Sequence, residues 1–193
     1  VPNAGHFDGQ RWVGTFAGLP PAGAWTLRVG LVAAYAAAVC RWLWDGYRRY
    51  RAHYRRAAWT PRDDVVDHLR THRWGRFGLA VVVCFLVLAA FAPALGPTTL
   101  EQNVARPFSH DLTYWNADAG EVDTVVVGEA NLQSQSVGTD ENVGPWQSDR
   151  YGRFHPLGTT TDGKDLFTFV AWGARVSLAV ALASMLGAGL LAL

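Results

Sequence analysis

The sequence is poor in the residues and motifs that enzymes and small secreted domains depend on. Its 193 residues include two cysteines and one methionine, and Lys164 is the single lysine among 17 basic residues. Cys40 and Cys84 lie in apolar segments, where a thiol behaves as a small hydrophobe, so they indicate no disulfide framework. The G-x-S-x-G, G-x-x-x-x-G-K-[ST] and H-E-x-x-H patterns are all missing from the sequence. We therefore expect no enzymatic activity from this chain.

Hydrophobic residues make up 50% of the chain and gather in three runs. The run at 77–95 carries no charge and nearly crosses a hydrocarbon core of about 30 Å. The run at 173–193 contains one early charge, Arg175, which can reach the membrane interface. The run at 25–44 is shorter between its charges but has tryptophans at both ends. The sequence therefore predicts an all-α membrane protein with three transmembrane helices.

The first run has a second interpretation as a cleaved signal peptide. Ala34-Tyr35-Ala36 is similar to a cleavage site, whereas the region before it is long and not strongly basic. Cleavage would also leave the arginine-rich segment at 45–76 on the translocated side, against the usual charge bias. We favour a transmembrane helix at 25–44.

Charge asymmetry predicts the orientation. The segment at 45–76 is rich in arginine and should stay in the cytoplasm, whereas acidic residues dominate the segment at 96–172, which should lie outside with residues 1–24. Arginines and tyrosines alternate over 47–56, a pattern that also occurs in nucleic-acid binding. Its position beside a transmembrane helix favours contact with anionic lipid in the bilayer instead, so we expect no nucleic-acid partner.

The long external segment should be mostly irregular. Residues 121–128 have the composition of a strand and fit a small lid or hairpin. Thr161 and Asp162 are candidates for capping the helix that follows. His110 and His155 lie near carboxylates, but no metal-binding spacing supports a metal site, so we interpret them as solvated polar residues.

Two blocks of residues resemble the permeases of the dipeptide/oligopeptide/nickel family of ABC importers, of the DppC and OppC type. The first block is Phe91-Ala92-Pro93 followed by Glu101-Gln102-Asn103. The second block keeps the order and spacing of a family motif that the resemblance places near the external mouth. Its residues are His155, Pro156, Leu157, Gly158, Thr159, Gly163, Lys164, Asp165, Gly173, Ala174, Arg175, Ser177 and Leu178. Thr160, Lys164, Thr168 and Phe169 depart from the residues that the family usually has.

The resemblance implies a permease subunit of the plasma membrane that pairs with a second permease subunit and two cytoplasmic ATPase subunits. ATP and magnesium would be bound by those ATPase subunits, so no cofactor is expected in this chain, and an external solute-binding protein would deliver a peptide or similar solute. The helix at 25–44 would be additional to the family's usual first helix, and 104–154 would be a long insertion. The chain starts at Val1 and ends in an apolar run, so we expect a fragment that lacks the ATPase-coupling loop. A membrane-anchored receptor or sensor and a structural membrane subunit remain alternatives.

Overall fold

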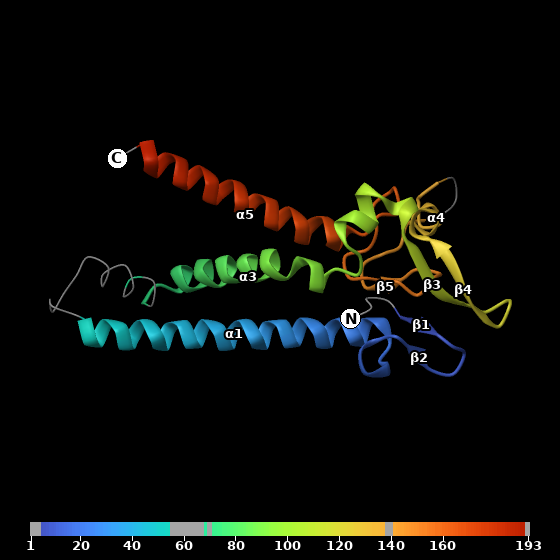
Figure 1. Cartoon of the computed structure of the whole chain (residues 1–193), viewed down its shortest axis with the longest axis horizontal. Coiled ribbons are helices and arrows are strands. Elements are labelled where there is room, and N and C mark those ends of the chain that lie inside the picture. Colours follow the sequence, from blue (N-terminus) through green and yellow to red (C-terminus); the bar gives the residue numbers. More distant parts are fainter. Residues whose placement is uncertain (1–4, 55–67, 69–70, 138–140, 192–193) are drawn as a thin grey trace.

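Three long helices extend from one region that contains all the short strands described (Figure 1). The computed structural model describes residues 5–54, 68, 71–137 and 141–191. Its long helices are α1 (Pro21–Tyr54), α3 (Arg73–Leu95) and α5 (Leu166–Leu191). Each is long and apolar enough to cross a membrane. This confirms the prediction of an all-α membrane protein with three candidate spans.

The helices extend beyond the apolar runs from which they were predicted. Helix α1 contains the predicted span 25–44 and continues to Tyr54, because no proline or helix-ending turn follows Trp44 until position 61. The first part of the predicted arginine-rich loop is therefore helical, while 55–67 and 69–70 lie outside the described residues. Helix α3 ends at Leu95, just before Gly96 and Pro97, where the sequence predicts a stop.

Short elements build the region between α3 and α5. A π-helical turn, η2 (Glu101–Ala105), and a 3-10 turn, η3 (Pro107–Ser109), lead into the antiparallel hairpin of β3 (Asp111–Asn116) and β4 (Glu121–Val126). Helix α4 (Val127–Leu132) follows directly, so it takes the last two residues of the strand predicted at 121–128. The predicted segment is thus one arm of a hairpin.

Two smaller hairpins flank this one. The first, before α1, pairs β1 (His6–Phe7) with β2 (Trp12–Val13) and is followed by the turn η1 (Phe16–Gly18). The second pairs β5 (Gln147–Ser148) with β6 (Phe154–His155) shortly before α5. Together with β3 and β4 they form what we call the loop region, which covers one end of the helix bundle (Figure 1).

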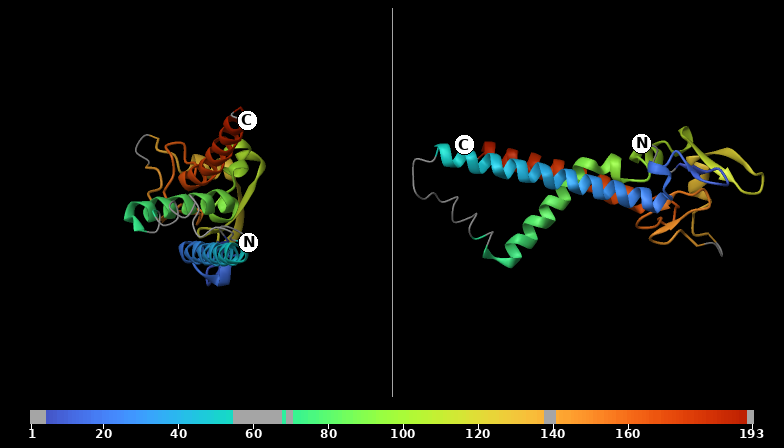
Figure 2. Two further views of the ribbon diagram at one scale, coloured as in Figure 1. Left: turned by 90° about the vertical axis from the view of Figure 1, so that its left-hand side faces the viewer. Right: turned by 90° about the horizontal axis from the view of Figure 1, so that it is seen from below.

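Helix packing is concentrated next to the loop region. Helix α3 packs mainly on α5 and much less on α1, and it leans away from α1 toward the opposite end (Figure 2). The buried residues of the bundle are small or lie near the helix ends, which lets the backbones approach closely. These residues are Ala24, Ala89, Ala92, Leu95, Ala171 and Ala174. Beyond them, most of α5 is exposed in this chain.

Candidate functional site

Helix α5 begins at a carboxylate that its own first turn binds. Asp165 Oδ2 accepts hydrogen bonds from the backbone amide of Thr168 (2.6 Å) and from its hydroxyl (2.7 Å). This is N-cap geometry, which gives a partner to an amide that has none inside the helix. Thr161 and Asp162, the predicted caps, are exposed and lie before the helix start. That prediction is wrong because α5 starts at Leu166, which puts Asp165 rather than Thr161 or Asp162 at the capping position.

The other oxygen of the same carboxylate binds the histidine of the second motif block. His155 Nδ1 lies 2.8 Å from Asp165 Oδ1, and the histidine side chain is 1% exposed. The interpretation of His155 as a solvated residue is therefore wrong. His110, the other histidine considered for a metal site, is half-buried and accepts a hydrogen bond from the Val127 amide through its carbonyl.

Asn103 joins the two motif blocks. Its side-chain amide donates to the Asp165 carbonyl (3.1 Å), and its Oδ1 accepts from the Asp165 backbone amide (2.9 Å). The hydroxyls of Thr98 and Thr168 lie 3.1 Å apart, so Thr168 keeps a polar role despite departing from the family's usual residue. Two segments more than sixty positions apart, the exit from α3 and the start of α5, are thus bound through buried polar groups.

A buried ion pair extends this network into the loop region. Arg153 Nε donates to Asp149 Oδ2 at 2.6 Å, and Arg153 Nη1 donates to Asn131 Oδ1 at 2.7 Å. His155 Nε2 lies 3.6 Å from the same Asp149 oxygen. We call the whole set the junction cluster. Its residues are Thr98, Asn103, Asn131, Asp149, Arg153, His155, Asp165 and Thr168, all of them buried.

The charges of the junction cluster favour a protonated histidine. Burial alone lowers the pKa of His155, but hydrogen bonds and charge from Asp149 and Asp165 outweigh it and raise that pKa above its usual value of 6.5. Burial likewise works to raise the pKa of Asp149, yet His155 and Arg153 together bring that pKa below its usual value of 3.8. Two cations then face two carboxylates, so the buried charges balance.

Two glycines of the second block are required by close backbone approaches. Gly158 (φ +81°) and Gly163 (φ +72°) adopt a left-handed conformation that favours glycine. A Cβ on Gly163 would collide with the carbonyl oxygen of Asn131, and one on Gly158 would lie 2.7 Å from the carbonyl oxygen of Val143. These glycines therefore let the loop close over the cluster.

The rest of the second block is divided between the loop and α5. Pro156 and Thr159 are buried, and Thr159 exchanges hydrogen bonds with Val143. The remaining members sit at the edge of the loop or along α5 and do not join the junction cluster. They are Leu157 and Lys164 in the loop, and Gly173, Ala174, Arg175, Ser177 and Leu178 on α5. Of these, Ala174 is buried at the α3 contact, and the Arg175 guanidinium lies over the Trp172 ring.

Helix α1 contacts the end of α3 and the loop region through one tryptophan, Trp25. Trp25 Nε1 donates to the Leu95 carbonyl at the end of α3 (2.8 Å), which satisfies one of the carbonyls that a helix end leaves unpaired. Its ring contacts those of Trp146, Phe154 and Phe167, with centroids 5.6–5.7 Å apart. This aromatic cluster attaches α1 to the loop region and to the first turn of α5.

The chemistry of the junction cluster is structural. Among the described residues, no group of three or more His, Cys, Asp and Glu side chains is arranged to hold a metal ion. Most of its polar atoms hydrogen-bond to one another or to a helix end, and they are closed to solvent. Asn131 Nδ2, Arg153 Nη2 and His155 Nε2 are buried without a hydrogen-bond partner. Such an arrangement fixes the position of helices rather than presenting a reactive group.

One known protein family is similar to part of this chain. Residues 60–114 match the family model described as the N-terminal TM domain of oligopeptide transport permease C. No curated protein and no solved structure is similar enough to count as a match. The match covers less than a third of the chain. Together with the three membrane-length helices, the match supports a permease component of an oligopeptide ABC transporter, a multi-pass protein of the plasma membrane that works in a complex with other subunits.

The matched residues contain α3 and the first motif block. Helix α1 precedes the match, and α5 with the second block follows it. The two hydrogen bonds between Asn103 and Asp165 thus connect the matched domain to the helix that comes after it. The sequence did not predict the roles of Asn131, Asp149 and Arg153, because polar residues with this spacing are equally common in solvated loops.

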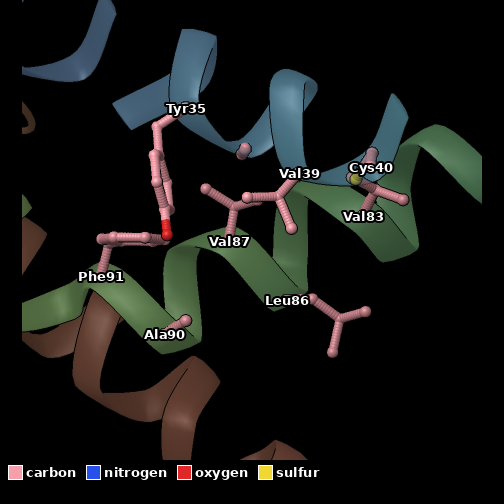
Figure 3. A pocket seen from close by; sticks show the side chains of 9 residues that line it. Tyr35, Val39, Cys40, Val83, Leu86, Val87, Ala90 and Phe91 are labelled. Atoms are coloured by element: carbon pink, nitrogen blue, oxygen red, sulfur yellow. The ribbon is translucent and has the colours of Figure 1, made fainter. Parts of the chain in front are cut away.

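A hollow also lies between α1 and α3. Side chains from both helices line a cavity of about 220 Å³ (Figure 3). The Tyr35 hydroxyl lies beside Phe91, and the two rings are edge to face. The rest of the lining is apolar apart from the Cys40 thiol. With so few polar groups, this groove has no means to orient a polar solute.

Proposed function

We propose that this chain is a transmembrane subunit of an ATP-driven importer of peptides or similar small solutes. In this proposal it pairs with a second permease subunit, two cytoplasmic ATPase subunits bind ATP and magnesium, and an external solute-binding protein delivers the solute. The family match at 60–114 carries the proposal. The three membrane-length helices and the arginine-rich segment on one side of them support it.

The junction cluster would give this subunit a rigid external end. Alternating access requires helices to rock between two arrangements around a solute path. Hydrogen bonds between Asn103 and Asp165, together with the buried pair of Asp149 and Arg153, hold the ends of α3 and α5 at fixed positions. Movement at the opposite ends, where the helices contact one another less, would then pivot about the loop region.

Purification from the native membrane tests the proposal. The chain would be tagged in its host, extracted in detergent, and its partners identified by mass spectrometry. We expect a second permease and two ATPase subunits to copurify, and ATP-dependent peptide uptake to be lost when the gene is deleted. Copurification without any ATPase subunit, combined with unchanged peptide uptake in the deletion strain, would contradict it. An isolated loop region that binds a ligand would then favour a receptor.

A further inference from the structure

Helix α1 continues past α3 at the end remote from the loop region. Both Figure 1 and Figure 2 show its last turns extending beyond the first turn of α3. Its 34 residues correspond to about 50 Å, whereas a hydrocarbon core is about 30 Å thick. Because the loop-side end of α1 is fixed by Trp25, the excess length lies on the side that the arginine distribution places in the cytoplasm.

This protruding part has two chemically different faces. At about 100° per residue, Arg41, Arg48, Arg49 and Arg51 fall within an arc of roughly 160°, which we call the arginine face. An apolar and aromatic set occupies the opposite side. Its members are Leu43, Tyr47, Tyr50 and Tyr54, all exposed. Within the arginine face, Arg41 pairs with Asp45 at 3.9 Å; the Arg41 side chain is 82% exposed and that of Asp45 is 40% exposed.

Two tryptophans place the arginine face at the membrane surface. Trp42 lies at one border of the arginine face and Trp44 lies within it. Both are exposed, as expected of side chains that sit among lipid headgroups. Arg48 follows Trp44 by about 6 Å along the helix axis and Arg51 by about 10 Å. The headgroup layer is roughly 5–7 Å thick on each side, so long arginine side chains at these positions reach the phosphates.

We propose that the arginine face of α1 is a binding site for anionic phospholipids of the surrounding membrane. Guanidinium groups hold phosphate through paired hydrogen bonds, and cations this close to the bilayer lie within about one Debye length of its surface charge. A soluble anionic partner would not require exposed tryptophans on and beside the face. The site does not depend on which solute the transporter carries.

Lipid binding to the purified full chain tests this assignment. The protein in detergent micelles is titrated with phosphatidylglycerol or with phosphatidylcholine, and binding is followed by microscale thermophoresis. We expect the wild type to bind phosphatidylglycerol more tightly than phosphatidylcholine. The triple variant Arg48→Gln, Arg49→Gln and Arg51→Gln should lose this preference. Each arginine near an anionic surface accounts for roughly a fivefold change in affinity, so the triple variant should weaken binding about a hundredfold.

Matched variants separate this site from a general charge effect. Arg11→Gln, Arg106→Gln and Arg150→Gln together remove the same charge from exposed positions near the loop region and should leave the affinity unchanged. Lysine in place of Arg48, Arg49 and Arg51 keeps the charge but loses the paired hydrogen bonds, so it should weaken binding less than glutamine does. Binding that lysine retains also excludes misfolding as the cause of the glutamine result.

Three results would overturn the proposal. The first is equal affinity of the wild type and the triple glutamine variant for phosphatidylglycerol. The second is displacement of the lipid by inorganic phosphate but not by chloride at the same ionic strength, which would indicate a site for free phosphate. The third is unchanged lipid binding with loss of copurified ATPase subunits, which would make the arginine face a protein interface.

Discussion

The two ends of the helix bundle differ in what holds them. Next to the loop region, helix ends are joined by buried hydrogen bonds, ion pairs and ring contacts that this chain supplies itself, as at Asp165 and Trp25. At the opposite end, most side chains of α5 and of the last turns of α1 are exposed. The difference indicates that contacts within this chain stabilise the loop-side end, while the opposite end needs lipid or other helices to cover its side chains.

The largest expected loss of stability follows from removing the Asp165 carboxylate at the loop-side end. Asp165→Ala removes the cap of α5 and leaves His155 buried without its closest partner. Breaking a buried charge pair from one side costs about 3–5 kcal/mol. Thermal unfolding in detergent, followed by tryptophan fluorescence, should show a much lower midpoint. Asp162→Ala, which removes an exposed carboxylate three positions away, should change stability by less than about 0.5 kcal/mol.

A pair of glycines compares the loop region with the exposed face of α5. Gly163→Ala places a methyl group against the Asn131 carbonyl in a left-handed backbone conformation, and we expect a loss of at least about 2 kcal/mol. Gly173→Ala adds the same methyl group to a helix position with no neighbour within 4 Å. It should be neutral or slightly stabilising. Equal unfolding midpoints for the two variants would contradict the close approach at Gly163.

These two predictions also show where sequence reasoning stops. The spans were predictable because length and apolar composition determine which segments can cross a membrane, as in α3. His155 and Asp165 were noticed as parts of a motif, but their contact depends on a loop closure that no local pattern encodes. Asp149 and Arg153 gave no signal, since an acid and a base four residues apart look alike whether solvated or buried. Whether such a pair is buried depends on tertiary packing, which here places Arg153 against the side chain of Asn131.

Acidity should stabilise the junction cluster within a limited window. Because the pKa of His155 is raised on folding, its stabilising effect is complete below about pH 6.5 and is lost as the pH rises through the raised value. The pKa of Asp149 is lowered, so its contribution is present above about pH 3.8 and is lost as the pH falls through the lowered value. The unfolding midpoint should therefore be highest between these limits. The shift should be smaller than for Gly163→Ala, because the packing is kept.

His155→Gln provides the control for this pH dependence. Glutamine cannot take up a proton in this range, so the decline on the alkaline side of the window should disappear while the acid side remains. An alkaline decline of the same size in both proteins would assign it to another group.

The attachment of α1 should be weaker but measurable. Trp25→Phe keeps a ring for the aromatic cluster and removes the hydrogen bond to the Leu95 carbonyl, for an expected loss of about 1 kcal/mol. Trp42→Phe, on the far part of the same helix and 73% exposed, should change the unfolding midpoint by less than half as much. A larger effect at Trp42 would mean that α1 is held at its far end instead.

In the isolated chain, we expect the smallest change in stability from a substitution in the half of α5 remote from the loop region. In the assembled transporter, the same substitution should have a larger effect. Leu186 is 69% exposed, so Leu186→Ala in detergent removes contacts with an apolar solvent and should cost less than about 0.5 kcal/mol. Ala171→Leu, at a fully buried position beside α3, should cost about 1–3 kcal/mol through overpacking in the same sample. If partner helices cover the far half of α5, Leu186→Ala in the purified complex should approach the cost of a buried truncation, about 2–5 kcal/mol. A cost that stays small in the complex would mean that this half of α5 faces lipid, and the contrast between the two ends would then belong to the transporter itself.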